Sequence, residues 1–285
     1  MTASALPNTR TTTAFALDGI CYAYTGGIAA LSDISLEIEQ GERVAILGAN
    51  GSGKSTLIKV MNGLLFPQAG TMSAFGEPIS EVALRDEDLS NRFRRRVGFI
   101  FQNSDAQLFS PTVRDEIAFG PLQMNLPIDE VEQRIEDIAK LLEIGKLLDR
   151  APFQLSGGEK KKVAIASSLA IGPDVLLLDE PTTGLDPRSQ HWLVELLAKL
   201  HGIGKTLITA THDLTIVPDI ADRVIVFSEE HRIVATDSVE SALSDTRLLV
   251  SVNLIHPHWH RHGRVWHEHP HEPDRPHVHP DGLVQ

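Results

Sequence analysis

The sequence predicts an α/β protein in which helices surround a parallel sheet, and three observations lead to this class. First, the apolar run Val44–Leu47 leads through a glycine-rich segment into the helical pattern Lys54–Leu64, which is a strand-loop-helix unit. Second, four later apolar runs have the length of strands: Val97–Phe101, Val175–Leu178, Leu207–Thr211 and Val224–Phe227. Most of them lack the alternation of a half-exposed strand, as is typical of parallel strands buried on both faces. Third, residues 103–172 are dominated by helical patterns, so we expect a helical subdomain inserted into the core.

Composition limits the functional classes. The chain has 285 residues, 42% of them apolar, and a formal charge of −12, which argues against nucleic acid as a partner. The densest basic cluster, Arg92–Arg96, is therefore interpreted as a solvated helix face or a subunit contact. No apolar run has the length of a membrane span, and the first 17 residues lack the apolar segment of a secretory signal. Cys21 is the only cysteine, which favours a reducing compartment.

The glycine-rich segment has the G-x-x-x-x-G-K-S spacing of a phosphate-binding loop. This spacing lets backbone N–H groups converge on a β-phosphate, while Lys54 supplies a positive charge and Ser55 a hydroxyl for Mg²⁺. The following helix directs its N-terminus at the same anion. The alternative is a glycine-rich turn that matches by chance. The expected ATP-binding residues are Gly48, Ala49, Asn50, Gly51, Ser52, Gly53, Lys54, Ser55 and Thr56.

Two acidic residues end the apolar run that begins at Val175. Asp179 is expected to bind Mg²⁺ directly or through water, and Glu180 to orient or deprotonate the attacking water. Two carboxylates at a strand end could also be exposed to solvent without any catalytic role. The upstream Lys54 favours the catalytic interpretation.

A second glycine-containing motif opens the helix Gly157–Ala170. Ser156 and Glu159 have the spacing of a capping box, so a plain helix start is one interpretation. The functional interpretation is that exposed N–H donors at this helix N-terminus bind a γ-phosphate. The lysines that follow, Lys160–Lys162, are expected to form a solvated face without a catalytic role. The motif consists of Leu155, Ser156, Gly157, Gly158 and Glu159.

Taken in order, these motifs resemble the ATPase subunits of ATP-binding-cassette (ABC) transporters, over about residues 15–235. The resemblance implies a P-loop NTPase fold with a RecA-like parallel-sheet core, an inserted α-helical subdomain and an antiparallel β edge. It also implies ATP and Mg²⁺ as ligands. Two copies would pair head-to-tail as a homodimer, with the Ser156 motif of one copy completing the ATP site of the other. Four further roles follow from it: Tyr24 stacks on adenine, Gln102 of the Q-loop touches Mg²⁺, His212 contacts the γ-phosphate, and Gly184, Leu185 and Asp186 form the D-loop.

A finer resemblance, in Phe101–Gln123 and Leu155–Ala166, is to the ATPases of energy-coupling-factor (ECF) importers of vitamins or of cobalt and nickel ions. In that family a groove after the Q-loop receives helices of a transmembrane scaffold subunit, which itself works with a substrate-binding membrane subunit. The protein would then lie at the cytoplasmic face of the membrane. The corresponding groove residues are Leu108, Phe109, Pro111 and Phe119, which could equally be ordinary core of the helical subdomain.

The last 30 residues are rich in histidine and proline and are expected to be disordered, because they offer little apolar surface to bury. Imidazoles at every second position would share one side of an extended chain, and imidazole suits nickel and cobalt. The alternative is a solvated tail that has a biased composition but no function. The candidate metal ligands are His256, His258, His260, His262, His267, His269, His271, His277 and His279.

The domain organisation expected is a flexible segment 1–13, an ATPase domain 14–235, a helical extension 236–255 and the tail 256–285. The function expected is ATP-driven dimer closure coupled to the uptake of cobalt or nickel. Three alternatives remain open: an ECF importer of a vitamin or other nutrient with an incidental tail, a non-transport ABC ATPase, and a metal-storage protein.

Overall fold

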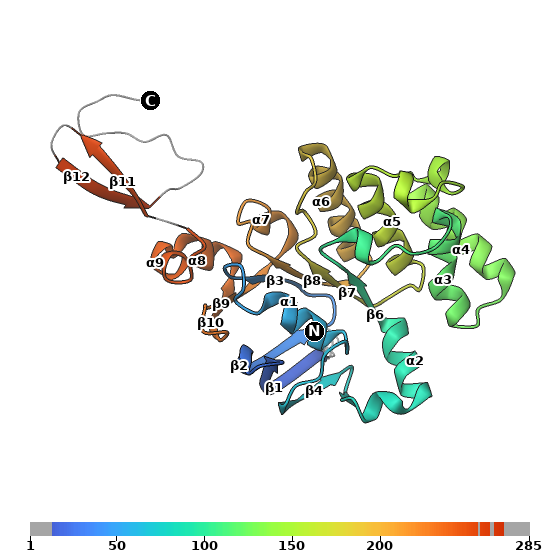
Figure 1. Cartoon of the computed structure of the whole chain (residues 1–285), viewed down its shortest axis with the longest axis horizontal. Coiled ribbons are helices and arrows are strands. Elements are labelled where there is room, and N and C mark those ends of the chain that lie inside the picture. Colours follow the sequence, from blue (N-terminus) through green and yellow to red (C-terminus); the bar gives the residue numbers. More distant parts are fainter. Residues whose placement is uncertain (1–12, 256, 263–264, 271–285) are drawn as a thin grey trace, which may run out of the picture.

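The computed structural model describes residues 13–255, 257–262 and 265–270, and its main body consists of three layers (Figure 1). A six-stranded sheet lies in the middle, with α1 and an antiparallel sheet on one face and helices α5 to α7 on the other. The expected parallel core, inserted helical subdomain and antiparallel edge are all confirmed.

The central sheet has the strand order β10-β9-β3-β8-β7-β6. All its neighbouring strands run parallel except β10, which pairs antiparallel with β9. The four strands predicted after the phosphate loop are confirmed within a few residues. The six strands are β3 (Arg43–Leu47), β6 (Val97–Ile100), β7 (Val175–Asp179), β8 (Thr206–Thr211), β9 (Arg223–Phe227) and β10 (Ile233–Ser238).

Alternate residues of these strands belong to two different hydrophobic cores. In β7, Leu176 and Leu178 face the core shared with α5 and α6, whereas Val175 and Leu177 face the core shared with α1 and the antiparallel sheet. Successive side chains of a strand point to opposite faces, so both faces of the sheet are covered. This double burial explains why the strands are apolar throughout and show no alternation.

The antiparallel sheet has the order β2-β1-β4-β5 and covers α1 (Lys54–Met61). Only the family resemblance predicted this sheet, because its strands carry no regular pattern. The pairing of β1 with β2 contains register shifts, which interrupt the two-residue period. The strands are β1 (Thr13–Tyr24), β2 (Ile28–Glu39), β4 (Ala69–Ala74) and β5 (Glu77–Ile79).

The helical subdomain lies between β6 and β7 in the sequence. The helical character predicted for residues 103–172 is confirmed by helices that include α4, and the helix predicted at 157–170 is confirmed as α5. Val131, Ile135 and Ala139 of α4 recur at helical spacing and join the core formed with α5. The helices here are α3 (Val113–Gln123), α4 (Ile128–Leu141) and α5 (Gly157–Leu169), with short 3₁₀ turns at Ser104–Ala106, Gly145–Leu147 and Pro152–Gln154; α2 (Glu87–Arg96) precedes β6.

The remaining helices follow the later strands. They are α6 (Pro187–Gly202), α7 (Val217–Ile220), α8 (Val239–Ser244) and α9 (Thr246–Ser251). The last two confirm the short helices predicted after β10, and Ala242 and Val252 fix them to the main core. Among residues 13–255 and the two strands that follow, no helix combines the length and apolar character that a membrane crossing requires.

Beyond the main body, the chain forms a hairpin of β11 (Pro257–His262) and β12 (Val265–Pro270). This regular structure differs from the disorder expected for the segment. Its register pairs His258 with His269 and His260 with His267. Histidine at every second position fits the two-residue period of a strand. Residues 1–12, 256, 263–264 and 271–285, including His256, His271, His277 and His279, lie outside the described residues.

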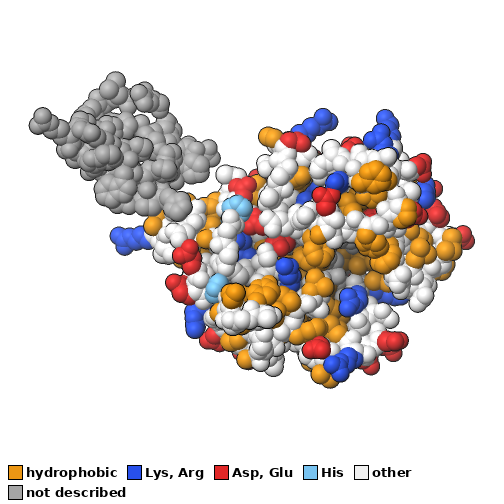
Figure 2. Space-filling model, in the orientation of Figure 1, with side chains coloured by type: hydrophobic (Ala, Val, Ile, Leu, Met, Phe, Trp, Pro, Cys, Tyr) orange, Lys and Arg blue, Asp and Glu red, His pale blue; other side chains and the backbone are white. Residues whose placement is uncertain are grey.

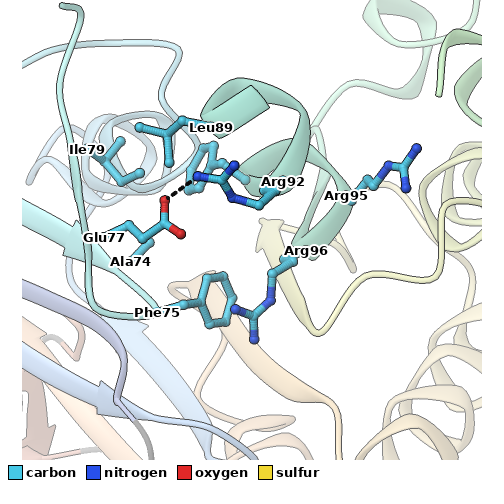
Figure 3. A pocket seen from close by; sticks show the side chains of 9 residues that line it. Ala74, Phe75, Glu77, Ile79, Leu89, Arg92, Arg95 and Arg96 are labelled. Carbon is cyan, nitrogen blue, oxygen red and sulfur yellow. Dashed lines mark hydrogen bonds and ion pairs between the residues drawn. The ribbon is translucent and has the colours of Figure 1, made fainter. Parts of the chain in front are cut away.

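The arginines of α2 form ion pairs and hydrogen bonds with other residues of the same chain. Arg92 forms an ion pair with Glu77 at 3.0 Å, and Arg96 forms one with Asp174 at 2.6 Å while lying 3.4 Å above the ring of Phe75 (Figure 3). Arg95 donates to the carbonyl of Met124. These contacts connect α2 to β5, to the turn between β4 and β5 and to the residue before β7. Arg92, Arg94 and Arg95 are nevertheless exposed, as expected of a solvated helix face.

Candidate functional site

The phosphate loop connects β3 to α1, as the sequence predicts. Gly53 precedes α1 with φ of 112°, and a Cβ atom at this position would lie 2.3 Å from the carbonyl oxygen of Ala30. Only glycine avoids this collision, because a backbone atom cannot move away as a flexible side chain would. The sequence therefore keeps the loop tight enough to leave its N–H groups free for an anion.

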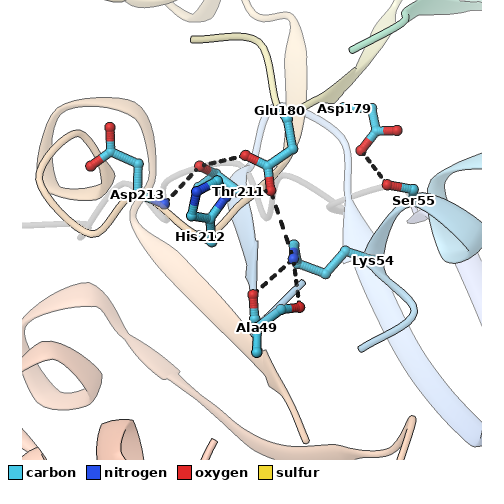
Figure 4. Close-up of polar contacts among 9 residues, drawn as sticks. Ala49, Lys54, Ser55, Asp179, Glu180, Thr211, His212 and Asp213 are labelled. Atoms are coloured by element: carbon cyan, nitrogen blue, oxygen red, sulfur yellow. Dashed lines mark hydrogen bonds and ion pairs between the residues drawn. The ribbon is translucent and has the colours of Figure 1, made fainter. Parts of the chain in front are cut away.

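Lys54 lies at the centre of the site with 5% of its surface exposed. Its ammonium donates to the carbonyls of Gly48 (2.7 Å) and Ala49 (3.1 Å) and lies 3.7 Å from Oε1 of Glu180 (Figure 4). Burial lowers the pKa of Lys54, while the charges of Glu180 and Asp179 act in the opposite direction. A buried cation beside a phosphate loop is equipped to bind a phosphate group.

Ser55 and Asp179 come together although 124 positions separate them in the sequence. The Ser55 hydroxyl donates to Oδ1 of Asp179 at 2.7 Å (Figure 4). Burial raises the pKa of Asp179, and the hydrogen bond from Ser55 partly offsets this rise. A hydroxyl and a carboxylate at the carboxyl end of a parallel sheet are oxygen ligands of the kind that Mg²⁺ prefers, so this pair fits that ion.

Glu180 connects the site to β8. Its Oε1 accepts a hydrogen bond from Nδ1 of His212 at 2.9 Å, and its Oε2 one from the Thr211 hydroxyl at 3.4 Å. Its backbone has φ of 44°, a conformation that costs a non-glycine residue about 1–3 kcal/mol. Contacts with Lys54, Thr211 and His212 fix the carboxylate in one orientation, which suits a group that must position a water molecule.

Lys54, Ser55 and Glu180 line one cavity of about 520 Å³ that also includes Gln102 and Tyr24. Asp179 and His212 lie next to these residues but do not line it. The Tyr24 hydroxyl lies 3.1 Å from that of Thr56, and its ring contacts Tyr22 edge to face. We call this the nucleotide cavity. Its lining residues are Tyr24, Ile28, Ala29, Ala30, Asn50, Gly51, Gly53, Lys54, Ser55, Thr56, Gln102, Glu180 and His231.

The signature turn, Ser156–Gly158, lies outside that cavity. Among the described residues, none from Leu155 to Glu159 is part of its lining. The predicted capping box is present: Ser156 Oγ accepts from the N–H of Glu159, and Glu159 Oε2 accepts from the N–H of Ser156 at 2.8 Å. These hydrogen bonds hold the pKa of Glu159 below its usual range. The turn is exposed, and the structure does not bring it to the phosphate loop of its own chain.

The predicted D-loop leads into α6. Asp186 caps that helix by accepting from the N–H of Ser189, and Gly184 lines a second cavity of about 490 Å³ with Glu180 and His212. A Cβ atom on Gly158 would lie 2.9 Å from Oγ of Ser189. The signature turn and the D-loop therefore border neighbouring parts of one surface.

The expectation of a solvated lysine face after the signature turn is wrong for Lys161. Lys160 does lie at the surface and pairs with Asp105. Lys161 is only 3% exposed, and burial lowers its pKa to about 8. A helix with 3.6 residues per turn can direct neighbouring side chains to solvent and to core, which a run of identical residues does not reveal.

His231 also belongs to the site, although no sequence motif predicts it. Its Nδ1 lies 3.2 Å from the carbonyl oxygen of Ser52, and its own carbonyl accepts from the N–H of Ser32. The turn between β9 and β10 thus supports the phosphate loop. A single histidine in a polar turn carries no pattern that would have indicated this position.

For the histidine tail, the structure gives the strand register described above and no side-chain geometry. Among the residues whose side chains are described, no group of three or more His, Cys, Asp or Glu is arranged to hold a metal ion. The predicted tail site thus rests on residues outside that set.

Comparison with known proteins agrees with this geometry. The family model described as "ABC transporter" matches residues 31–183. The chain belongs to the ABC transporter family. It is therefore an ABC ATPase, which binds ATP with Mg²⁺ and hydrolyses ATP. A Methanosarcina acetivorans protein named as an ABC transporter ATP-binding protein is 53% identical over 94% of this chain and 98% of its own.

More specific names occur among the other relatives of this ABC ATPase. NikO of Rhodobacter capsulatus, a nickel import ATP-binding protein, is 47% identical over 86% of this chain and 96% of its own. EcfA2 of Methanospirillum hungatei, an energy-coupling factor transporter ATP-binding protein, is 42% identical over 83% of this chain and 58% of its own. The resemblance to ECF-type ATPases is thereby confirmed.

Solved structures show the same fold. CbiO1 of Clostridium perfringens, described as part of the ABC transporter complex cbiONQ, has 37% identity and a TM-score of 0.73 over 85% of this chain and 95% of its own. The ATP-binding cassette MJ0796, solved as a dimer in a post-hydrolysis state with ADP and phosphate, has 28% identity and a TM-score of 0.71 over 79% of this chain and 98% of its own.

Proposed function

We propose that this ABC ATPase drives an ECF-type importer of nickel or cobalt ions by ATP-dependent closure of a homodimer. The observation that carries this proposal is the separation of its two nucleotide-binding elements. Lys54, Ser55 and Glu180 converge on one cavity, whereas the exposed signature turn belongs to another surface. A second copy, turned head-to-tail, would bring its own signature turn to that cavity. ATP would then bridge the two chains.

Each residue of the cavity takes a role that matches its contacts. Lys54 binds the β- and γ-phosphates and lies close enough to Glu180 to hold its carboxylate in place. Ser55, Gln102 and Asp179 would hold Mg²⁺, which would supply positive charge beside the phosphates. Glu180 accepts the proton of the attacking water, and the hydrogen bond with Nδ1 of His212 orients the Glu180 carboxylate.

The other predicted residues act at the edges of the site. Tyr24 stacks on adenine, and its hydroxyl contact with Thr56 ties the ring to α1. Ser156, through its hydroxyl, and Gly158, through its N–H group at the start of α5, bind the γ-phosphate held by the partner copy. Gly184, Leu185 and Asp186 cross to the partner beside its signature turn. Hydrolysis and phosphate release remove the bridging charge, so the two copies separate.

The groove after the Q-loop is the proposed docking surface for the membrane subunits. Phe109 and Phe119 are 67% and 43% exposed and contact each other edge to face at 4.9 Å. They line a cavity of about 290 Å³ between α2, α3 and α5. Figure 2 shows hydrophobic side chains on this right-hand part of the molecule, where Figure 1 places α3 to α5. Leu108 and Pro111 lie in the same segment. Binding there would keep the protein at the cytoplasmic face of the membrane, next to the scaffold and substrate-binding subunits.

The histidine hairpin favours a transition-metal cargo over an organic nutrient. Its register sets His258 opposite His269 and His260 opposite His267, which gives two cross-strand histidine pairs in adjacent same-face positions. Imidazole binds nickel and cobalt well and Mg²⁺ poorly. We propose that the hairpin and the histidines around it bind the transported ion or sense its supply. The domain limits proposed are 14–235 for the ATPase, 236–255 for the extension and 256–285 for the histidine tail.

Two experiments test this function. Uptake of radioactive Ni²⁺ and Co²⁺ is measured in cells lacking the gene, then with wild type or Lys54→Ala restored. Uptake that returns only with wild type supports the proposal. Equal metal uptake in all three strains, with loss of vitamin uptake, would favour the vitamin importer. Separately, calorimetric titration of Ni²⁺ into the full chain and into residues 1–255 should give binding heat only for the full chain, and equal heats would refute the tail site.

A further inference from the structure

The buried Lys161 joins two elements that act in different parts of the ATPase cycle. Its ammonium donates to the carbonyl oxygens of Phe101 at 3.1 Å and Gln102 at 3.0 Å, where β6 ends and the Q-loop begins. Its backbone lies in α5, in the second turn after the signature turn. One side chain therefore connects the helix that carries Ser156 to the main chain that carries Gln102.

Gln107 adds a second connection between the same two elements. Its side-chain oxygen accepts from the N–H of Phe101 at 3.2 Å, and its amide nitrogen donates to the carbonyl of Ala164 in α5 at 2.8 Å. Both backbone polar groups of Phe101 are thus bonded to side chains that belong to α5 or are tied to it. The segment Phe101–Gln102, where β6 meets the Q-loop, therefore cannot shift along α5 without breaking several hydrogen bonds at once.

Apolar packing alone gives no reason for a charged side chain at this position. Removing an ammonium group from water is costly, and two carbonyl dipoles and the charge of Asp179 offset that cost only in part. A methionine of similar length would fill the same space without that cost, but it would leave the carbonyls of Phe101 and Gln102 without this donor. What the ammonium adds is directional hydrogen bonding to two consecutive carbonyls, which fixes the orientation of the Q-loop backbone.

We propose that Lys161 is a positioning residue that makes the signature turn and Gln102 move as one unit. A shift of α5 that brings Ser156 to the partner's nucleotide would carry the Q-loop backbone with it. Gln102 already lines the nucleotide cavity of the single chain, and engagement of the signature turn would then change its position there. This inference rests on the head-to-tail pairing proposed above, and it adds the device that links pairing to the state of the cavity.

The test uses the full chain and compares three substitutions in α5. Lys161→Met removes the donors and keeps the length of the side chain. Lys161→Arg restores two parallel donors. Lys162→Met is the matched control, since Lys162 lies in the same helix but contacts Leu142 and Trp192 instead of the Q-loop. For each substitution, ATP affinity and kcat are measured in the otherwise unchanged chain. The ATP concentration needed for dimerisation is measured in a Glu180→Gln background.

Lys161→Met should lower kcat about tenfold or more and raise the ATP concentration needed for dimerisation by a similar factor, with ATP affinity of the single chain unchanged within about twofold. Lys161→Arg should recover much of the lost kcat, and Lys162→Met should behave as wild type. In a Gln102→Ala background, Lys161→Met should have little further effect, because a positioning residue acts through its target.

Unchanged kcat and dimerisation in Lys161→Met would overturn the inference. Losses of kcat that add up when Lys161→Met is combined with Gln102→Ala would also overturn it. A fall of both ATP affinity and melting temperature in Lys161→Met, which Lys161→Arg does not correct, would do the same. If Lys161→Met does not fold, Gln107→Leu cuts the second connection without touching a charge and should show the same separation of kcat from affinity. Failure of the Glu180→Gln parent to dimerise would instead count against the proposed pairing itself.

Discussion

The nucleotide cavity and the signature turn, which the proposed function assigns to the same ligand, are built in opposite ways. In the cavity, buried Lys54 contacts Gly48, Ala49 and buried Glu180, and Glu180 accepts a hydrogen bond from the partly exposed His212 next to the cavity. The signature turn is an exposed helix start whose polar groups contact only their own capping partners. The cavity is thus prepared by its own chain, while the turn is shaped to act on another molecule. This contrast explains how an ATP-binding domain can respond to ATP by pairing.

The largest effect is expected for Lys54→Ala on the cavity side. A unit charge about 4 Å from a phosphate is worth about 4 kcal/mol near a surface, so nucleotide binding or turnover should fall about a thousandfold. Phosphate release and ATP binding measure this loss, with Lys199→Ala, at an exposed position of α6, as the control. Normal turnover in Lys54→Ala would break the assignment of the phosphate loop.

The next effect is expected for Glu180→Gln, which separates chemistry from binding. The amide is nearly the same size as the carboxylate but cannot accept a proton, so turnover should fall by about 10²–10⁴ while ATP remains bound. Rapid filtration after a single turnover should recover intact ATP with the protein. The control is Glu195→Gln, an exposed position on α6. Rapid release of ADP by Glu180→Gln would show that another group acts as the base.

A smaller effect is expected for Ser156→Asp, which keeps an acceptor at the cap of α5. Aspartate caps helices as well as serine does, but it cannot donate to Glu159 Oε2 as the Ser156 hydroxyl does at 2.9 Å, so some stability is lost, while the added negative charge repels the partner's γ-phosphate. We expect turnover to fall about tenfold to a hundredfold with ATP affinity of the single chain unchanged. Ser156→Ala is the companion variant, with a loss of about 1 kcal/mol in stability measured by thermal unfolding. Reduced ATP affinity in Ser156→Asp would place the turn in the cavity of its own chain.

The smallest effect is expected at the rim of the cavity. Tyr24→Ala should raise KM for ATP about threefold to tenfold, since a stacking contact is worth about 0.5–1.5 kcal/mol, with kcat unchanged. Tyr24→Phe keeps the ring and should restore KM. Equal KM values for Tyr24→Ala and wild type would show that the Tyr24 ring does not stack on adenine.

The comparison also shows where sequence reasoning succeeds. Lys54, Asp179 and Glu180 could be predicted because fixed spacing within a strand-loop-helix unit, and at a strand end, leaves few geometries. Parallel strands such as β7 could be predicted because both faces are buried. β1 and β2 could not, since shifts in their register break the two-residue period. The burial of Lys161 and the support from His231 depend on contacts between distant segments, which no local pattern contains.

The most direct test of the central claim is sedimentation velocity of Glu180→Gln and of Glu180→Gln combined with Ser156→Asp, both with Mg-ATP. The account predicts a dimer for the first and a monomer with ATP bound for the second, because the signature turn of one chain completes the nucleotide cavity of the other. Two monomers, or two dimers of equal stability, would contradict it.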